Sequence, residues 1–246
     1  MSIQTPAELA ALRRVGEIVR LTLDALAAAV RPGISTEALD RVALDVATRH
    51  GARSAPKAEY GFPGTVLLSV NDEIVHGVPG GRVLQDGDLI SLDVTLEKDG
   101  FVADAARTVP VGRGSELGRQ LAEAAEAAFV ASLAVARAGT RVNEIGRVVD
   151  AEIRRRGFSI VPDLCGHGVG RKIHEAPSVP NHCVRSQRDV LTDGLVITIE
   201  PIITAGSPKF RTDRDGWTIR TRDGGWAAHH EHTLMITSGE PLLLTA

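Results

Sequence analysis

Cysteine is nearly absent from this chain, which has only Cys165 and Cys183 among its 246 residues. Two thiols are too few for a disulfide framework, and the N-terminal residues lack the charged and apolar pattern of a secretory signal. We therefore expect a cytoplasmic protein. Aromatic residues make up only 3% of the sequence, so the core is expected to consist mainly of Ala, Val, Leu and Ile.

The chain also lacks a strong excess of charge of either sign. Its 28 basic and 31 acidic residues give a formal net charge of -3, and both signs are interspersed, so charge does not point to nucleic acid as the main partner. A hydrophobic content of 43% is typical of a water-soluble globular protein. This composition excludes disorder, collagen and membrane spanning.

Helical signals open the sequence. Thr5-Pro6-Ala7-Glu8 supplies an N-cap, a proline at the first helical position and a capping-box acid, followed by an apolar periodic stretch to Val30. A second helix is predicted from about Ser35 to His50, ending at Gly51.

This helical region recurs later in the chain. Gly33 to Gly51 and Gly139 to Gly157 have equal spans, and an alanine-rich helix precedes each copy, at residues 6–30 and 116–137. A chance match of two amphipathic helices is the alternative. We predict a single catalytic domain, residues 1–246, built of two pseudo-symmetric halves at about 1–112 and 113–246.

Strand-like segments follow each helix pair, at residues 65–70, 88–97 and 100–111, and then at 190–204, 218–221 and 228–237. Helices followed by strands, twice over, indicate an α+β fold with a central antiparallel sheet covered by helices rather than βαβ alternation.

One predicted hairpin carries two aspartates, Asp93 and Asp104, on strands that flank Lys98-Asp99-Gly100. A Lys98-Asp99 loop places the acids directly opposite each other, an Asp99-Gly100 loop places them diagonally on one face, and a three-residue loop separates them. Paired acids repel in a strand, and a divalent cation offsets that cost. An exposed sheet face with two solvated acids is the alternative.

Three further segments carry candidate ligands. His167 stands among glycines in Cys165-Gly-His167-Gly-Val-Gly170, Glu200 ends an apolar β-branched run before Pro201, and Glu231 lies at the start of a strand. The alternatives are that His167 is an ordinary hydrogen-bonded histidine and that Glu231 is only a polar residue at the start of a strand. The glycine segment does not match a phosphate loop, and His229-His-Glu231-His lacks the spacing of a zincin helix.

Together these residues balance two divalent cations. Four carboxylates match the charge of two ions, with neutral His167 completing a five-residue cage. Carboxylate-rich ligation fits Mn, Fe(II), Co or Zn pairs better than a structural zinc site. Two such ions can share a hydroxide nucleophile and stabilise the transition state of amide hydrolysis.

With these pieces in place, the sequence resembles type I methionine aminopeptidase, a member of the pita-bread metallohydrolases. The matching motifs cover almost the whole chain in the family's order: Ser69-Val-Asn-Asp-Glu-Ile-Val-His76-Gly-Val-Pro79, the Asp93 and Asp104 hairpin, Cys165-Gly-His167-Gly-Val-Gly170, Thr198-Ile-Glu200-Pro201 and Glu231-His-Thr233.

The resemblance implies metal-dependent removal of N-terminal methionine from nascent polypeptides with a small second residue, through a hydroxide that bridges two metals. It implies that Asp93 chelates one metal, Asp104 and Glu231 bridge both, and His167 with Glu200 completes the other site. It further implies that Glu200 accepts the proton of the attacking water. His76 is then expected near the leaving nitrogen, and His174 as a donor to the substrate carbonyl.

The resemblance also implies an apolar methionine pocket with walls at Phe62, Leu67, Ile173 and Trp217. The sequence departs from the family at two positions. Leu67 stands where cysteine is common and Glu59 where tyrosine is common, and Tyr60 is a candidate to fill the vacancy. The partners implied are nascent peptides with N-terminal Met, and the ribosome is a candidate. No membrane or nucleic-acid substrate is implied, and a monomer is expected.

Three other functions compete with this hypothesis. Xaa-Pro aminopeptidases and prolidases share the ligand pattern but generally carry an additional N-terminal domain, for which the few residues before the first helix leave no room. A catalytically dead protein-binding relative is disfavoured by the intact ligands. An unrelated metal-dependent lyase or phosphatase is disfavoured by the lack of a basic phosphate clamp near the acids.

Overall fold

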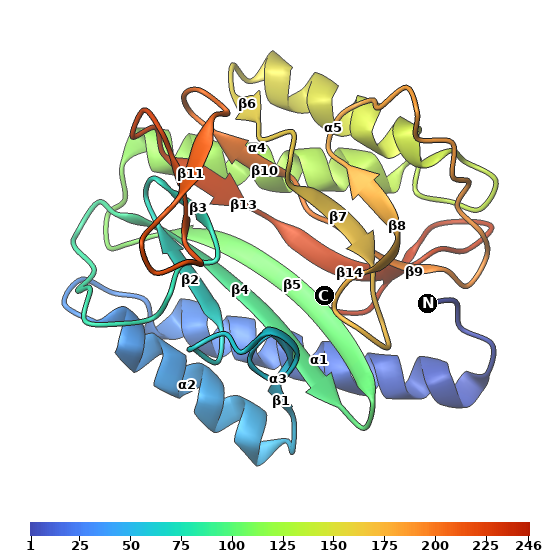
Figure 1. Ribbon diagram of the computed structural model, residues 1–246, viewed down its shortest axis with the longest axis horizontal. Coiled ribbons are helices and arrows are strands. Elements are labelled where there is room, and N and C mark those ends of the chain that lie inside the picture. The colour runs from blue at the N-terminus through green and yellow to red at the C-terminus, as the bar shows by residue number, and fades with distance from the viewer.

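The computed structural model describes residues 1–246 and has a curved antiparallel sheet, with two pairs of long helices packed against the same face. In Figure 1, α1 and α2 lie along one half of the sheet, and α4 and α5 lie along the other half. The five helices are α1 (Pro6–Ala29), α2 (Thr36–Arg49), α3 (Ala55–Tyr60), α4 (Glu116–Leu133) and α5 (Val142–Arg155). The predicted α+β architecture is confirmed.

The main sheet has nine strands, in the order β1-β4-β5-β14-β9-β7-β8, with β2 also paired to β4 and β15 to β14. Its members are β1 (Arg53–Ser54), β2 (Leu67–Val70), β4 (Leu89–Lys98), β5 (Phe101–Pro110), β7 (Cys165–Gly168), β8 (Glu175–Pro180), β9 (Val196–Ile199), β14 (Glu231–Met235) and β15 (Leu242–Leu243).

Two small sheets flank it, with strand orders β13-β10-β6 and β11-β12-β3. Their members are β3 (Glu73–Val75), β6 (Ser159–Ile160), β10 (Ile202–Thr204), β11 (Phe210–Thr212), β12 (Ile219–Thr221) and β13 (Ala227–His229).

The predicted capping signals explain where the helices begin. The Thr5 hydroxyl accepts the Glu8 N–H, and the Glu8 carboxylate accepts the Thr5 N–H in return, which completes the capping box of α1. At α2, the Ser35 hydroxyl accepts the Ala38 N–H. These caps satisfy amide groups that have no partner within a helix.

The third predicted helix was expected to reach residue 137, but α4 ends at Leu133. Beyond it the chain bonds to neighbouring segments instead: the Ala138 N–H donates to the Thr237 carbonyl, and the Gly139 N–H donates to the Leu191 carbonyl. Tertiary hydrogen bonds therefore override the helical propensity of the alanine-rich tail.

Two predicted strands are each broken into two. Residues 190–204 form β9 and β10, separated by Glu200-Pro201, and residues 228–237 lie in β13 and β14, separated by His230. In each case one piece pairs in the main sheet and the other in a small sheet. Pro201 has no N–H to continue the hydrogen bonds between strands. Its carbonyl accepts the His230 N–H (3.3 Å), so the two breaks face each other.

Apolar side chains pack each helix pair against the main sheet. The larger core cluster joins α1 and α2 to β4 and β5, and the second joins α4 and α5 to β9 and β14. Gly33 and Gly139 share a φ of 88°, which supports the pseudo-symmetric division at about residue 112; the division itself stays a prediction. No helix combines the length and apolar character needed to cross a membrane.

Candidate metal centre

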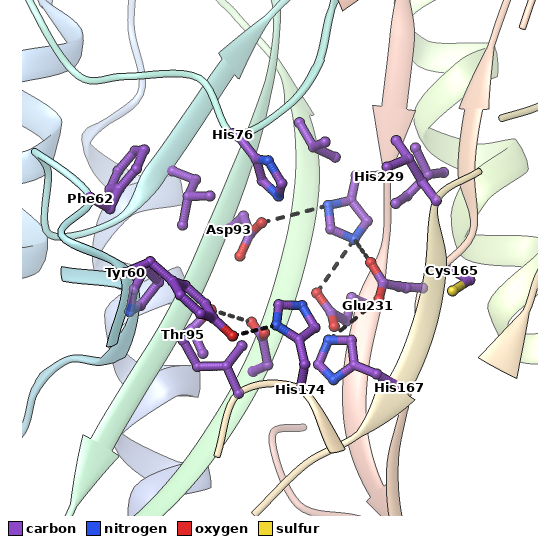
Figure 2. A pocket seen from close by; sticks show the side chains of 18 of the residues that line it. Tyr60, Phe62, His76, Asp93, Thr95, Cys165, His167, His174, His229 and Glu231 are labelled. Carbon is purple, nitrogen blue, oxygen red and sulfur yellow. Dashed lines mark hydrogen bonds and ion pairs between the residues drawn. The ribbon is translucent and has the colours of Figure 1, made fainter. Parts of the chain in front are cut away.

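All eleven residues predicted for the site line one cavity of about 350 Å³, and Figure 2 shows several of them converging on its centre. The five expected ligands are Asp93, Asp104, His167, Glu200 and Glu231, and the six expected substrate contacts are Phe62, Leu67, His76, Ile173, His174 and Trp217. The structure therefore brings together residues from both halves of the chain. Their individual roles stay predictions.

The two aspartates come from the β4–β5 hairpin. Lys98 pairs with Phe101, so the loop is Asp99-Gly100, with φ of 52° and 79°. Asp93 consequently pairs with Ala106 and Asp104 with Thr95, which is the diagonal arrangement on one face. The Thr95 hydroxyl donates to Oδ1 of Asp104 (2.8 Å) and fixes that carboxylate.

The two glutamates stand at the breaks between sheets. Glu200 follows β9 directly, and Glu231 is the first residue of β14. Because both strands leave one sheet for another at this point, the two carboxylates are turned into the cavity together. Both are almost completely withdrawn from solvent.

His167 projects from β7, where its N–H donates to the Thr198 hydroxyl (3.1 Å). Its Nδ1 lies 2.9 Å from the Gly168 carbonyl. A carbonyl only accepts, so Nδ1 carries the proton and the Nε2 lone pair is free. Nε2 lies 3.6 Å from Oε1 of Glu200, as expected of two atoms that bind one cation.

Two groups of three potential ligands lie close enough to surround a cation. One consists of Asp104, His167 and Glu231, and the other of Glu200, His229 and Glu231; within each group all ligand atoms lie within 4.8 Å of one another. Glu231 belongs to both groups, so the cluster is continuous.

The two remaining predicted histidines stand at the rim of this cluster. His76 has a left-handed backbone, with φ of 61°, and the Gly77 N–H after it donates to the Ser69 hydroxyl (3.0 Å). A strained backbone in a cavity is typical of a functional position. The His174 ring lies 4.3 Å from the His167 ring, and Nδ1 of His174 lies 2.8 Å from the Tyr60 hydroxyl.

Comparison with known proteins identifies the family. The model of metallopeptidase family M24 matches residues 10–238. The chain is 41% identical to a methionine aminopeptidase of Clostridium perfringens over 97% of this chain and 96% of the other. The chain belongs to metallopeptidase family M24. It is also 35% identical to the Escherichia coli methionine aminopeptidase, covering all of this chain and 94% of that one.

Solved structures share the fold of this chain. The methionine aminopeptidase of Thermotoga maritima superposes with a TM-score of 0.96 at 31% identity, over 100% of this chain and 99% of that one. A prolidase from Pyrococcus furiosus gives a TM-score of 0.80 at 22% identity, but the match spans only 65% of that chain. The resemblance to methionine aminopeptidases and the pita-bread fold are confirmed.

Burial dominates the electrostatics of this M24 site. It raises the pKa of Asp93 to about 8, and it raises the pKa of Asp104 well above its usual range, with repulsion from Glu231 adding to both shifts. The pKa values of Glu200 and Glu231 are raised as well, chiefly by burial. Four buried acids crowded together hold protons unless cations replace them.

The rim histidines are neutral at physiological pH. Burial lowers the pKa of His76 and of His174 to about 4. Burial also lowers the pKa of His167, which favours the neutral ring that a metal ligand requires. None of these three rings brings a competing positive charge to the cluster.

The donor set fits divalent cations. Oε1 of Glu231 is buried without any hydrogen-bond partner, which is costly unless another group satisfies it. Carboxylate oxygens with an imidazole nitrogen suit Mn, Fe, Co or Zn. Cys165 lines the cavity, but burial raises the pKa of its thiol, which disfavours the thiolate that binds metals.

The expected methionine pocket is apolar. The Phe62 and Trp217 rings meet edge to face, with centroids 5.3 Å apart. Tyr60 lines the cavity too, whereas the Glu59 carboxylate accepts the Ile173 N–H (3.1 Å) and thereby anchors the segment that carries His174. Glu59 therefore makes a backbone contact and does not line the cavity, whereas Tyr60 does.

The sequence analysis missed His229 and the contact between Tyr60 and His174. A signal for His229 was available, because residues 229 and 231 share a face if the strand runs on with a period of two. Tyr60 gave no such signal, since its partner lies 114 positions away in the sequence.

Proposed function

We propose that this chain removes N-terminal methionine from polypeptides, preferring those with a small second residue, by metal-dependent hydrolysis. The observation that carries the proposal is the convergence of five potential ligands and two neutral histidines on one cavity with an apolar wall. Full-length similarity to methionine aminopeptidases supports the same substrate class.

In this proposal Asp93, Asp104, His167, Glu200 and Glu231 hold two divalent cations, which supply Lewis-acid polarisation of the scissile carbonyl and activation of water. Asp104 and Glu231 would be shared by the two cations, and Asp93 would complete one of the two sites. His167 and Glu200 complete the other. Glu200 would also accept the proton of the attacking water.

The neutral histidines act on the substrate. His174 donates Nε2–H to the substrate carbonyl, and His76 lies near the leaving nitrogen. The methionine side chain lies against Phe62 and Trp217, where contact between a thioether and an aromatic ring contributes about 0.3 to 1.5 kcal/mol. Leu67 and Ile173 form the remaining wall.

The test is a comparison of substrates with metal-reconstituted protein. We expect release of methionine from Met-Ala-Ser to exceed by far the turnover of Leu-Ala-Ser and of Xaa-Pro peptides. Equal or faster cleavage of the Leu or Xaa-Pro peptides would overturn the proposed specificity. In parallel, Glu200→Gln should lower kcat by about 100-fold or more, because both a ligand and the proton acceptor are lost. Normal activity of this folded variant would contradict the assigned role.

We further propose that the enzyme acts in the cytoplasm on nascent chains leaving the ribosome, as a monomer. Both cysteines are free, Cys165 half-buried and Cys183 exposed, which fits a reducing compartment. Light scattering of the purified protein tests the oligomeric state: a single species at the monomer mass of 26.1 kDa is expected.

A further inference from the structure

His229 lies among the carboxylates of the cavity but has no part in the function proposed above. It is 2% exposed, and its Nε2 is 3.4 Å from Oε2 of Glu200 and 3.4 Å from Oε2 of Glu231. Its Nδ1 lies 4.0 Å from Oδ2 of Asp93. Figure 2 shows the His229 ring with Asp93 and Glu231 on either side.

The two oxygens of Glu200 face different rings. Oε1 lies 3.6 Å from Nε2 of His167, the expected ligand, whereas Oε2 lies 3.4 Å from Nε2 of His229. In the proposed ligand set, Oε1 of Glu200 faces the cation together with His167, which leaves Oε2 facing His229, although Glu200, His229 and Glu231 also lie close enough to surround a cation themselves. A carboxylate that binds a metal through one oxygen is commonly held at the other by a hydrogen-bond donor.

The backbone of His229 is fixed from two directions. Its N–H donates to the Thr108 hydroxyl (2.8 Å), and the same hydroxyl donates to its carbonyl (2.7 Å). In addition, His229 pairs with Ile202 across β13 and β10. The ring is thus attached to a rigid position.

We propose that His229 is a positioning residue, whose Nε2–H is shared between Glu200 and Glu231 and restrains both carboxylates in the orientation that binds the metal pair. Nε2 lies at equal distances from the two acceptor oxygens, and this buried nitrogen has no other hydrogen-bond partner. The inference rests on the metal-dependent function proposed above and adds a residue that orients two of the metal ligands.

Two amide substitutions separate the two ring nitrogens of His229. A glutamine amide nitrogen stands at the distance of Nε2 along the side chain, whereas an asparagine amide nitrogen stands at the distance of Nδ1. His229→Gln therefore keeps a donor facing Glu200 and Glu231, and His229→Asn does not. His232→Gln is the matched control, because His232, a half-buried histidine of β14, contacts the Thr245 hydroxyl (2.9 Å) and does not line the cavity.

The experiment titrates the metal-free proteins with Co(II) by calorimetry and records X-ray absorption spectra of the loaded proteins. We expect His229→Asn to weaken Co(II) binding by about 10- to 100-fold, and His229→Gln and His232→Gln to stay close to the original protein. The number of imidazoles bound to cobalt should be the same in all four. At saturating Co(II), His229→Asn should lower kcat for Met-Ala-Ser while KM changes little.

Several results would overturn the inference. Unchanged Co(II) affinity in a folded His229→Asn variant would exclude a positioning role, and failure of His229→Gln to restore affinity would exclude the shared hydrogen bond. Loss of an imidazole from the cobalt spectrum in both variants would make His229 a ligand instead. If the original protein itself bound no Co(II), the proposed metal-dependent function would fail, which is a distinguishable outcome.

Discussion

At the scale of single residues, the contact between Tyr60 and His174 decides which ring nitrogen carries a proton. Burial raises the pKa of the Tyr60 phenol, so the hydroxyl stays protonated and can donate to Nδ1 of His174 (2.8 Å). A ring that accepts at Nδ1 carries its proton on Nε2. This is the tautomer that the proposed donation to the substrate carbonyl requires.

Tyr60→Phe removes this hydroxyl and leaves the ring. We expect kcat for Met-Ala-Ser to fall by roughly 3- to 10-fold, the equivalent of one hydrogen bond of about 0.5 to 1.5 kcal/mol. The melting temperature should stay unchanged, because Tyr60 is an exposed side chain. Steady-state kinetics and a thermal scan check both statements, and an unaltered kcat would show that His174 needs no such partner.

At the scale of elements, the close approach of β7 to β9 positions His167. A Cβ placed on Gly166 would lie 2.5 Å from the Thr198 carbonyl oxygen of β9, and one on Gly168 would lie 2.2 Å from the Ala176 carbonyl oxygen. The glycines around His167 therefore allow neighbouring backbones to pack against β7, which is the physical reason for the glycine-rich motif.

Gly166→Ala should push β7 away from β9 and displace His167 from the cluster. We expect weaker Mn(II) binding and a loss of most of the activity on Met-Ala-Ser, because ligand misplacement of about 1 Å is enough to cost roughly 100-fold. Gly80→Ala is the control, since a Cβ there meets nothing within 4 Å. If both variants bound Mn(II) equally well, the packing argument would be wrong.

The elements also show what the sequence could predict. The β4–β5 hairpin was predicted from the turn signal at Lys98-Asp99-Gly100, but three loops stayed open, and only the structure shows the Asp99-Gly100 loop that places Asp93 and Asp104 on one face. The breaks at Pro201 and His230 were not readable as exchanges between sheets, because they depend on pairings with distant strands. The period of two that links residues 229 and 231 could have pointed to His229, but its contacts with Asp93 and Glu200 depend on distant segments.

At the scale of the whole molecule, the family resemblance and the helix-then-strand order predicted the architecture, since the motifs extend over nearly the full chain. Contacts between the two halves could not be predicted from local sequence patterns. Asp93 and Asp104 come from one half, and His167, Glu200 and Glu231 from the other. Neither half alone holds the complete cluster, so folding of the entire chain is what assembles it.

Without metal, the stability of the protein should depend on pH, because the buried carboxyl groups of the cluster lose their protons as the pH rises. The folded pKa of Asp93, about 8, lies above its ordinary value of 3.8, so its contribution favours the fold at low pH and is lost as the pH rises through 8. The neutral His76 and His174 are deprotonated in both states above about pH 7. The metal-free protein should therefore lose stability from about pH 7 to pH 8.5.

The expected loss is about 1.4 kcal/mol per pH unit for each carboxyl that titrates, or a fall in Tm of about 2 to 4 °C for each kcal/mol. Saturating Mn(II) should raise Tm and reduce this slope, because the cations replace the protons. Thermal scans of metal-free and Mn(II)-loaded protein at several pH values check this. A metal-free Tm that rises over the same range would contradict the pKa shifts assigned to burial.

The most direct measurement is anomalous diffraction from a crystal of the protein loaded with Mn(II). We predict two anomalous peaks in the cavity, with Asp104 and Glu231 in contact with both ions, Asp93 with one, and His167 and Glu200 with the other. Peaks elsewhere in the molecule, or an empty cavity in protein that binds Mn(II) in solution, would contradict the account.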